Sequence, residues 1–273
     1  MIANILSIAG SDPSGGAGIQ ADIKAISANG GYAMAAITAL TAQNTQGVRA
    51  VQMIAPDIVA AQIAAIRADI HIDAVKIGML GDAAIISAVA QALQGLDAPV
   101  VLDPVMVAKS GDRLLQAAAV AALRDMLGIA TILTPNLPEA ADLLDLPEAA
   151  TRDQMQHQAL ALLALGPKAV LLKGGHLAGD DCPDLLADST GLIWLPGLRH
   201  GTRNTHGTGC TLSSALATLL GQGLPLAEAA AQAKAYVADA IVMADRLSVG
   251  QGHGPAHHFH AFFKGSSNDP SDL

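Results

Sequence analysis

A glycine turn, Gly207-Thr208-Gly209-Cys210, opens a long alanine- and leucine-rich stretch and carries the clearest chemical signal in the 273-residue chain. Its two glycines let successive backbone N–H groups point into one concavity, and a helix that begins there adds the positive end of its dipole. Such a turn binds anions, phosphate groups in particular. A plain helix cap made by Thr208 or Thr211 is the alternative, and the glycines on both sides of Thr208 favour the anion site.

Cys210 lies in the first turn of this expected helix. The pKa of a thiol can fall at a helix N-terminus, and the group could then act as a base or a nucleophile. Buried, unreactive cysteines occur as well, so the residue types alone leave the role of Cys210 open. Cys182 lies in a polar loop and shows no sign of function, and two cysteines are too few for a disulfide framework.

Charged side chains recur where short apolar runs end. Asp103 follows one such run, Lys173 follows another, and Glu139 lies just after a third. Carboxylates at neighbouring strand ends can organise Mg²⁺ directly or through water, so Asp103 and Glu139 are candidates for that role. Asn136 and Glu139 also have the spacing of a helix capping box, which is compatible with it. Lys173 predicts a phosphate or an ion-pair partner, and Lys76 inside its own apolar run is a similar case.

A second glycine-rich segment, Gly15-Gly16-Ala17-Gly18, invites two familiar interpretations. A dinucleotide-binding fingerprint over residues 16–21 would start too far from the preceding strand, and the expected acidic residue is missing. A Walker A loop requires a Gly-Lys pair, which the chain does not contain. The segment is therefore expected to be a flexible loop that lets the backbone approach a ligand closely.

Four histidines, His253, His257, His258 and His260, gather in a glycine- and proline-rich segment near the C-terminus. Such a tract could bind a metal ion. No cysteine or acidic residue accompanies it in the sequence, so packing at the edge of a pocket is the favoured interpretation.

Short apolar runs alternate with longer helical stretches, which is typical of a mainly parallel sheet with helices on both faces, a three-layer αβα fold. In such sheets ligands lie beyond the carboxyl ends of the strands. The segment Asp184–Leu195 predicts a small β-hairpin in addition. Strands are expected at Asn4–Ala9, Ala35–Leu40, Val48–Ile54, Ala74–Ile77, Pro99–Leu102, Thr131–Leu133 and Ala169–Leu172, and helices near 17–29, 56–69, 82–94, 114–127, 138–144, 153–165, 208–221 and 225–246.

Composition narrows the class of protein. Aromatic residues make up 2% of the chain and the net charge is −9, which argues against a nucleic-acid reader or a basic membrane-binding surface. The N-terminus lacks the basic flank of a signal peptide, and no apolar run is long enough to span a membrane, so a cytoplasmic protein is predicted. Residues 1–263 are expected to form one domain and the polar tail, residues 264–273, to be disordered.

Several segments, in this order along the chain, resemble one family. They are Gly10–Asp22, Leu40–Thr45, Lys76–Leu80, Leu102–Val107, Thr134–Ala140, Leu172–Gly175, Asn204–Thr211, and Gly252–Pro255 with His258 and Phe259. Over residues 2–263 the chain resembles the hydroxymethylpyrimidine/phosphomethylpyrimidine kinases, the thiamine-pathway members of the ribokinase-like superfamily. The resemblance to this family's C-terminal segment further disfavours a metal site at the histidine cluster.

The resemblance implies a homodimeric kinase that uses ATP and Mg²⁺. It would phosphorylate 4-amino-5-hydroxymethyl-2-methylpyrimidine and then the monophosphate. By motif, the pyrimidine pocket would comprise Gly10, Asp22, Gln43, Met79 and Val105. The anion hole would be Gly207–Cys210, with Lys173 and Thr208 on the nucleotide phosphates and Asp103 and Glu139 organising Mg²⁺. An amide such as that of Gln43 suits an aminopyrimidine, because it can pair with a ring nitrogen and an exocyclic amine together.

Most sugar kinases of the superfamily carry Asp as the base where this chain carries Cys210. A weaker base can suffice, because phosphoryl transfer through a loose transition state depends mainly on positioning and charge neutralisation. A vitamin B6 kinase acting on pyridoxine or pyridoxal, or an enzyme with both activities, stays open as an alternative. A non-catalytic pyrimidine binder is disfavoured, because Asp103, Lys173 and Cys210 are all retained.

Overall fold

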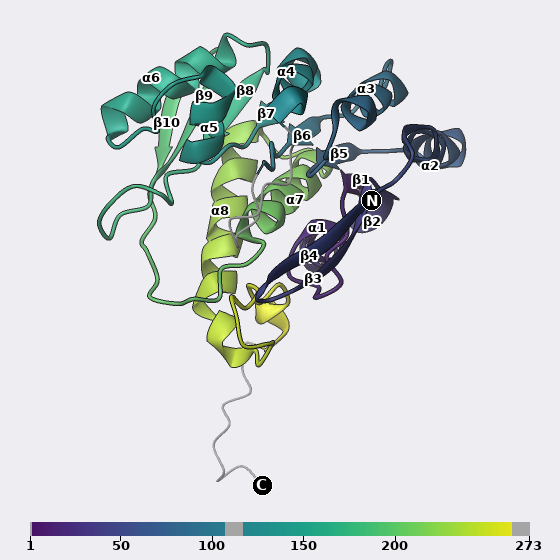
Figure 1. The fold of residues 1–273 in the computed structure, drawn as a ribbon. Helices are drawn as coiled ribbons and strands as arrows, with labels where there is room; N and C mark the ends of the chain where they lie inside the picture. Colours follow the sequence, from purple (N-terminus) through teal and green to yellow (C-terminus); the bar gives the residue numbers. More distant parts are fainter. Residues whose placement is uncertain (1, 107–116, 264–273) are drawn as a thin grey trace, which may run out of the picture.

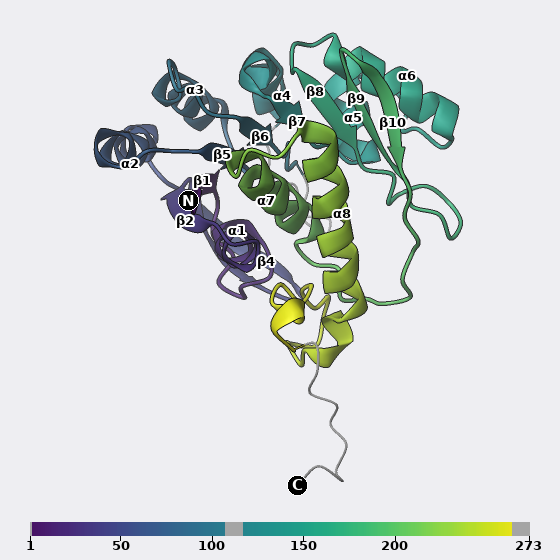
Figure 2. The same cartoon turned by 180° about the vertical axis from the view of Figure 1, so that it is seen from behind.

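An eight-stranded sheet runs through the middle of the protein, with helices on both of its faces (Figures 1 and 2). The structure is a computed structural model that describes residues 2–106 and 117–263. The strand order is β10-β9-β8-β7-β6-β5-β1-β2, and β1, β2 and β5 to β8 run parallel. The strands are β1 (Asn4–Ala9), β2 (Tyr32–Ile37), β5 (Ala74–Ile77), β6 (Val100–Leu102), β7 (Ile132–Leu133), β8 (Ala169–Leu172), β9 (Asp184–Asp188) and β10 (Gly191–Leu195). The predicted three-layer αβα fold is confirmed.

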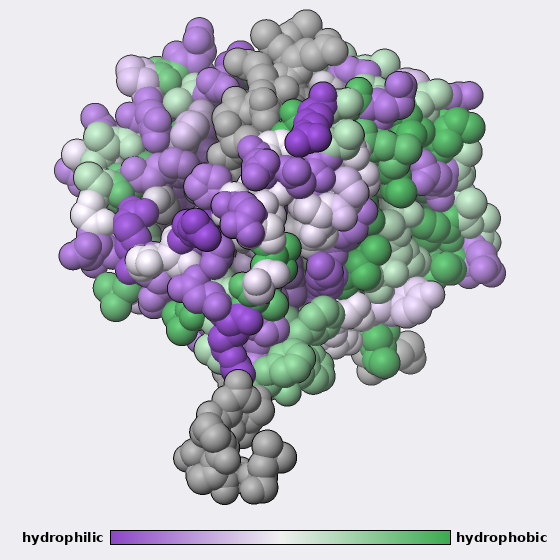
Figure 3. All heavy atoms as spheres, turned by 60° about the horizontal axis from the view of Figure 1, so that its bottom comes forward, coloured by the Kyte–Doolittle hydropathy of each residue, from purple (hydrophilic) through white to green (hydrophobic). Residues whose placement is uncertain are grey.

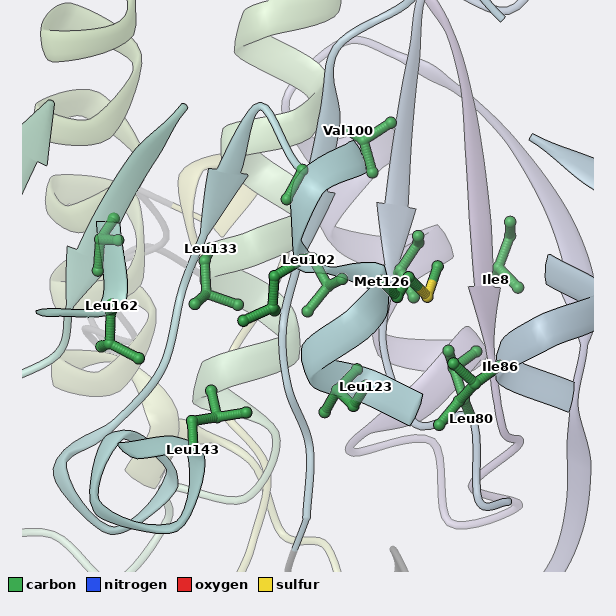
Figure 4. Packing of buried hydrophobic residues seen from close by; sticks show 14 of the residues in the cluster. Ile8, Leu80, Ile86, Val100, Leu102, Leu123, Met126, Leu133, Leu143 and Leu162 are labelled. Atoms are coloured by element: carbon green, nitrogen blue, oxygen red, sulfur yellow. The ribbon is translucent and has the colours of Figure 1, made fainter. Parts of the chain in front are cut away.

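Helices cover both faces of the sheet, and the side chains of each strand point alternately to one face and to the other. Leu6 and Ile8 of β1 point to one core and Ile5 to the other, as a period of two residues requires (Figure 4 shows part of the first core). The first core is covered by α2 (Pro56–Asp69), α3 (Ala83–Ala92), α4 (Ala117–Met126), α5 (Leu137–Leu144) and α6 (Arg152–Leu163), and the second by α1 (Gly18–Ala28), α7 (Thr208–Gly221) and α8 (Leu226–Val242).

Local signals in the sequence set several helix starts. Helix α2 begins at Pro56, whose fixed φ and missing N–H suit a first helical position. Helix α5 begins with the predicted capping box: the Asn136 side chain accepts from the Glu139 N–H and the Glu139 side chain from the Asn136 N–H, both at 2.8 Å. Residues 114–116 of the predicted fourth helix and the predicted disordered tail lie outside the described residues.

The chain after β2 differs from the prediction. The expected strand Ala35–Leu40 divides at Thr38, and its second part begins β3 (Ala39–Asn44), which pairs antiparallel with β4 (Gly47–Met53) in a separate two-stranded sheet. The Thr38 hydroxyl donates to the Met79 carbonyl at 2.7 Å and so holds the bend at the carboxyl end of the main sheet. We call β3, β4 and their turn the β3–β4 arm.

The two edges of the main sheet are finished in different ways. The predicted hairpin is confirmed as β9 and β10, and it extends the sheet beyond β8. Its turn is closed by Asp188, whose Oδ1 accepts from the N–H and the hydroxyl of Thr190 at 2.7 and 2.6 Å. At the opposite edge, the Gln62 side-chain amide of α2 bonds both the N–H and the carbonyl of Ile37 in β2, at 2.9 and 3.1 Å.

The surface mixes polar and apolar residues. On the face drawn in Figure 3, hydrophilic residues predominate over the middle and hydrophobic ones gather toward one side. None of the helices within the described ranges has the length and apolar character needed to cross a membrane.

Candidate active site

The carboxyl ends of the parallel strands meet the N-terminus of α7 around a cavity of about 450 Å³. Strand alternation and the β3–β4 arm bring together side chains that lie far apart in the sequence. The sequence-predicted residues that line this cavity are Gly10, Gln43, Met79, Asp103, Val105, Glu139, Lys173 and Gly207–Cys210. Of the site residues predicted from sequence, Asp22 does not line it.

The glycine turn has the geometry of an anion site. Gly207 precedes α7 with φ of 74°, the left-handed region, and a Cβ at this position would collide with the Gly16 carbonyl. Within the described residues no side chain caps α7: the Thr211 hydroxyl donates to the Gly207 carbonyl at 2.8 Å and accepts no hydrogen bond from a free N–H group of the helix. The Thr208 N–H makes only a long bond, 3.4 Å, to the Thr205 carbonyl, and the N–H groups of Gly209 and Cys210 remain able to bind an anion.

A lysine and two carboxylates lie next to the turn. The Lys173 Nζ is 2.9 Å from Asp103 Oδ1 and 3.9 Å from Glu139 Oε2. A Cβ on Gly209 would lie 3.3 Å from the Lys173 Nζ, so the turn passes directly over the ammonium group. Burial lowers the pKa of Lys173, but the charges of Asp103 and Glu139 raise it more, and the net shift is upward. Lys173 is therefore a permanent cation.

Glu139 is held in an electrostatic environment that disfavours its charge. Burial raises the pKa of Glu139 to about 7; the Lys173 charge opposes this and the Asp103 charge adds to it. Two carboxylates against one lysine thus leave this corner of the cavity with an excess of negative charge when both are ionised. A further cation would stabilise the ionised form of Glu139.

The contacts of Asp103 and Glu139 fit a weakly coordinated Mg²⁺ ion. Asp103 Oδ1 accepts from Lys173 and, at 3.2 Å, from the Thr134 hydroxyl, while Glu139 Oε2 accepts from the Asn136 N–H. Among the described residues no group of three or more His, Cys, Asp or Glu side chains could hold a metal ion. Mg²⁺ characteristically keeps several waters and takes one or two carboxylates together with substrate phosphates, so this donor set suits it.

The sequence left open whether Cys210 is an acidic thiol or a buried, unreactive one. Burial raises the pKa of the Cys210 thiol to about 11, and the Lys76 ammonium, which lowers that pKa, does not compensate. A place in the first turn of the helix therefore does not produce a thiolate here, because burial and the charges of Asp22 and Asp103 raise the pKa of the thiol. At neutral pH Cys210 is a protonated thiol, and very little of it is present as the basic thiolate.

Asp22 does not line the cavity, although the resemblance implied a place for it in the pyrimidine pocket. It is fully buried and lies 2.8 Å from the Lys76 Nζ. Its two oxygens also accept from the hydroxyls of Ser7 and Ser214, at 2.6 and 2.8 Å. The cause is the alternation of β5: Val75 and Ile77 fill one core, so Lys76 points to the opposite face, where it requires a carboxylate.

Asp12 and His206 form a contact to which the sequence analysis assigned no role. Asp12 Oδ2 lies 2.8 Å from His206 Nε2 and accepts from the Ala17 N–H, and its Oδ1 accepts from the Ser14 N–H. Burial raises the pKa of Asp12, but hydrogen bonds from His206 and Ser14 lower it more, and the net shift is downward. Asp12 thus ties the N-terminal glycine loop to the glycine turn. Its position after β1, at the same sheet edge as Asp103, was the available signal.

A second cavity of about 420 Å³ lies on the other side of the turn. Both cavities include Lys173, Thr208 and Gly209 in their walls. Much of the rest of the second cavity is apolar and includes Leu195, Pro196, Leu198, Leu212, Val237 and Ile241. The glycine turn therefore borders two cavities, each large enough for a small molecule.

A glycine turn with the geometry of an anion site, between two cavities on a three-layer αβα fold, fits a phosphotransferase. Residues 12–257 match the family described as phosphomethylpyrimidine kinase. The chain belongs to this family, as its motifs predicted.

Three relatives illustrate the match. The hydroxymethylpyrimidine/phosphomethylpyrimidine kinase of Rhizobium meliloti is 52% identical over 265 residues, which cover 97% of this chain and 100% of that protein. The structure of phosphomethylpyrimidine kinase from Clostridium difficile has a TM-score of 0.78 at 41% identity, covering 88% of this chain and 99% of that one. The pyridoxal kinase from Staphylococcus aureus in complex with AMP-PCP and pyridoxal has a TM-score of 0.87 at 32% identity, covering 96% of this chain and 95% of that one.

Proposed function

We propose that this protein is an ATP-dependent kinase that phosphorylates 4-amino-5-hydroxymethyl-2-methylpyrimidine and then its monophosphate to the diphosphate, in thiamine biosynthesis. The observation that carries the proposal is the pair of cavities that share Lys173, Thr208 and Gly209. A relative at 52% identity over almost the whole chain bears the names of both kinase activities, which supports the same substrates here.

The first cavity is the proposed acceptor site. Gly10, Gln43, Met79 and Val105 belong to its wall. The Gln43 amide offers a donor and an acceptor side by side, which matches an exocyclic amine next to a ring nitrogen. Met79 and Val105 add apolar contacts for a flat, methylated ring. A Cβ on Gly10 would lie 2.9 Å from the Met79 Cε, so glycine there keeps Met79 in place.

The second cavity is the proposed nucleotide site. Its apolar wall suits an adenine ring, and the shared residues Lys173 and Thr208 suit the phosphates. The Staphylococcus aureus neighbour carries an ATP analogue together with its alcohol substrate, which supports two ligands on this fold at once.

In the proposed transfer, the turn from Gly207 to Cys210 binds the moving phosphoryl group through its N–H groups, and Lys173 neutralises the charge that develops on it. Asp103 and Glu139 would hold Mg²⁺, mainly through its waters, and the ion when bound neutralises phosphate oxygens. Cys210 lies at the turn as a protonated thiol, which cannot accept a proton until it ionises. In a loose transition state little bonding to the attacking oxygen has formed, so the hydroxyl proton of the acceptor can leave late in the reaction. A strong base is therefore not required.

The decisive experiment is an assay of ADP release with four acceptors: the hydroxymethylpyrimidine, its monophosphate, pyridoxine and pyridoxal. We expect turnover of the first two, dependent on Mg²⁺. The likeness to pyridoxal kinase structures favours one alternative, which faster turnover of pyridoxal would establish. Comparable rates would show dual activity. Binding of the pyrimidine without turnover of any acceptor would indicate a non-catalytic binder and refute the proposal.

We further propose a homodimer built from single kinase domains over residues 1–263, in the cytoplasm. The β3–β4 arm supports the dimer, because an isolated two-stranded sheet is marginally stable and this one exposes Leu40 and Val51. The free Cys182 and Cys210 suit a reducing compartment. Light scattering should give twice the chain mass of 27.6 kDa, and the mass of one chain would contradict the dimer.

A further inference from the structure

The C-terminal segment over residues 250–258, which we name the strap, contacts the β3–β4 arm at one end. The N–H of Gly252 donates to the Thr45 hydroxyl at 3.1 Å, and the N–H of His253 donates to the Thr45 carbonyl at 2.9 Å. Thr45 directly follows β3, the strand that carries Gln43. A Cβ on Gly252 would run into the Thr45 carbonyl, so the two backbones lie in direct contact.

Further along, the strap contacts the chain that leads into the glycine turn. The N–H of Gly254 donates to the Asn204 Oδ1 at 3.1 Å, and the Gly254 carbonyl accepts from the His206 N–H at 3.0 Å. A Cβ on Gly254 would collide with the Asn204 side chain. Adjacent residues of the strap thus bond to Thr45 of the arm and to the segment 204–206, which lies more than 150 residues away from Thr45 in the sequence.

The last contact of the strap reaches the turn itself through His258. Its Nε2 lies 3.0 Å from the Thr211 hydroxyl, and that hydroxyl donates its one proton to the Gly207 carbonyl at 2.8 Å. The hydroxyl must then accept from His258, so Nε2 carries the proton. Burial lowers the pKa of His258 to about 3, which keeps the ring neutral. The Tyr236 hydroxyl fixes the backbone here by donating to the His258 carbonyl at 2.8 Å.

We propose that the strap holds the acceptor arm and the anion turn in one relative position, with Thr45 and His258 as its positioning residues. Through it, an acceptor bound at Gln43 favours the turn conformation that binds the nucleotide phosphates. The proposal rests on the proposed function for the identity of the two ligands. The histidine cluster thus serves in part to position Gly207.

The consequence is a coupling between the two cavities. An acceptor that orders the arm also orders the strap, which lowers the conformational-entropy cost of ordering the turn. The nucleotide then binds more tightly. By linkage the nucleotide must tighten acceptor binding by the same factor. A merely structural strap would stabilise the fold and leave this factor unchanged.

The test measures binding of a non-hydrolysable ATP analogue by calorimetry, with and without saturating hydroxymethylpyrimidine. We expect the pyrimidine to lower the Kd of the analogue about tenfold, which is within the usual range of coupling between sites. Thr45→Val, which removes the hydroxyl that accepts from Gly252, and His258→Leu should reduce this factor to below about twofold. His258→Gln, which keeps a donor near the Nε2 position, should restore most of it, and the neighbouring His257→Gln is the matched control.

A second measurement needs no ligand. Amide hydrogen exchange over residues 204–212 should be faster in His258→Leu than in the parent, and unchanged in His257→Gln. Parental coupling and parental exchange in both Thr45→Val and His258→Leu would overturn the proposal, as would an equal loss in His257→Gln. A failure of the proposed function appears instead in the unmodified chain, as absent pyrimidine binding, and the exchange measurement then still decides whether His258 holds the turn.

Discussion

Two lysine–aspartate pairs lie near the glycine turn and look alike by distance alone. Lys173 is 2.9 Å from Asp103, and Lys76 is 2.8 Å from Asp22. Their surroundings differ. The Lys173 side chain retains 14% exposure toward the cavity, whereas both side chains of the other pair are completely buried.

The difference lies in what else each pair contacts. Hydroxyls of Ser7 and Ser214 complete the coordination of Asp22, so that pair needs no ligand. Lys173 faces a second carboxylate, Glu139, and lies under the turn, so when both carboxylates are ionised this group of charges is balanced only by a further cation. An ion pair therefore indicates a functional site when it is accessible and incompletely balanced, and a structural element when it is sealed and satisfied.

The most severe test replaces the accessible lysine. Lys173→Met should reduce kcat by about a thousandfold or more, because it removes the cation that neutralises the transferred phosphoryl group. The melting temperature should change by only a few degrees, since Asp103 belongs to the wall of the cavity, where water or a cation can replace the lost ammonium group. Steady-state ADP release and thermal unfolding measure the two effects. The exposed Lys168→Met is the control, and a Lys173 variant with near-parental turnover would refute the catalytic assignment.

The sealed pair should show the opposite pattern. Lys76→Met should destabilise the protein by about 3–5 kcal/mol, because it leaves the Asp22 charge buried without compensation. Urea unfolding measures the loss. The double variant Lys76→Met, Asp22→Leu should recover part of it, since no buried charge then remains. Parental stability of the single variant would show that the pair contributes little to folding.

A side chain introduced at Gly209, between the turn and the accessible pair, tests whether turnover depends on the close approach of the turn to Lys173. Gly209→Val should lower kcat by about a hundredfold, the usual cost of disturbing one oxyanion-type contact. Folding should tolerate it, because the nearest atom, the Lys173 Nζ at 3.3 Å from the new Cβ, ends a flexible side chain. The same change at the open position Gly201 serves as the control. A variant that unfolds, or one that keeps full activity, would contradict this expectation.

The smallest effect is expected at Cys210, whose thiolate, when formed, would be attracted by both Lys76 and Lys173. With a pKa of about 11, the thiolate fraction rises tenfold for each pH unit between 7 and 9, so a rate that required the thiolate would rise equally. We expect no such rise. Cys210→Ser should lose less than about tenfold in kcat and keep a parallel pH profile. A steep alkaline rise in the parent that disappears in the serine variant would make Cys210 the base.

Elements with local signals were predictable from the sequence. The strands Ala74–Ile77 and Ala169–Leu172 and the helix Pro56–Asp69 have the predicted ends, because apolar runs, a proline and flanking polar residues mark them. The break at Thr38 was not predictable, since it depends on a hydrogen bond to Met79 and the run Ala35–Leu40 contains no turn residue.

For the site, position along the sheet was a better guide than residue chemistry. Asp103 and Lys173 follow strands, and the parallel sheet brings them together. The position of Asp22 was not predictable, because its partner Lys76 lies 54 residues away in the sequence and holds the carboxylate in the protein interior. The bond between Asp12 and His206 spans 194 residues, and no local pattern announces a contact of that range.

The Gln62 side chain at the edge of the sheet bears on how the protein avoids aggregation at high protein concentration. A parallel edge strand with free N–H and carbonyl groups can act as a template on which another chain adds a strand, and aggregation begins in that way. The Gln62 amide occupies both groups of Ile37, so the last residue of β2 offers an incoming chain no hydrogen bonds. One helical side chain thus serves as a surrogate strand residue where the sheet ends.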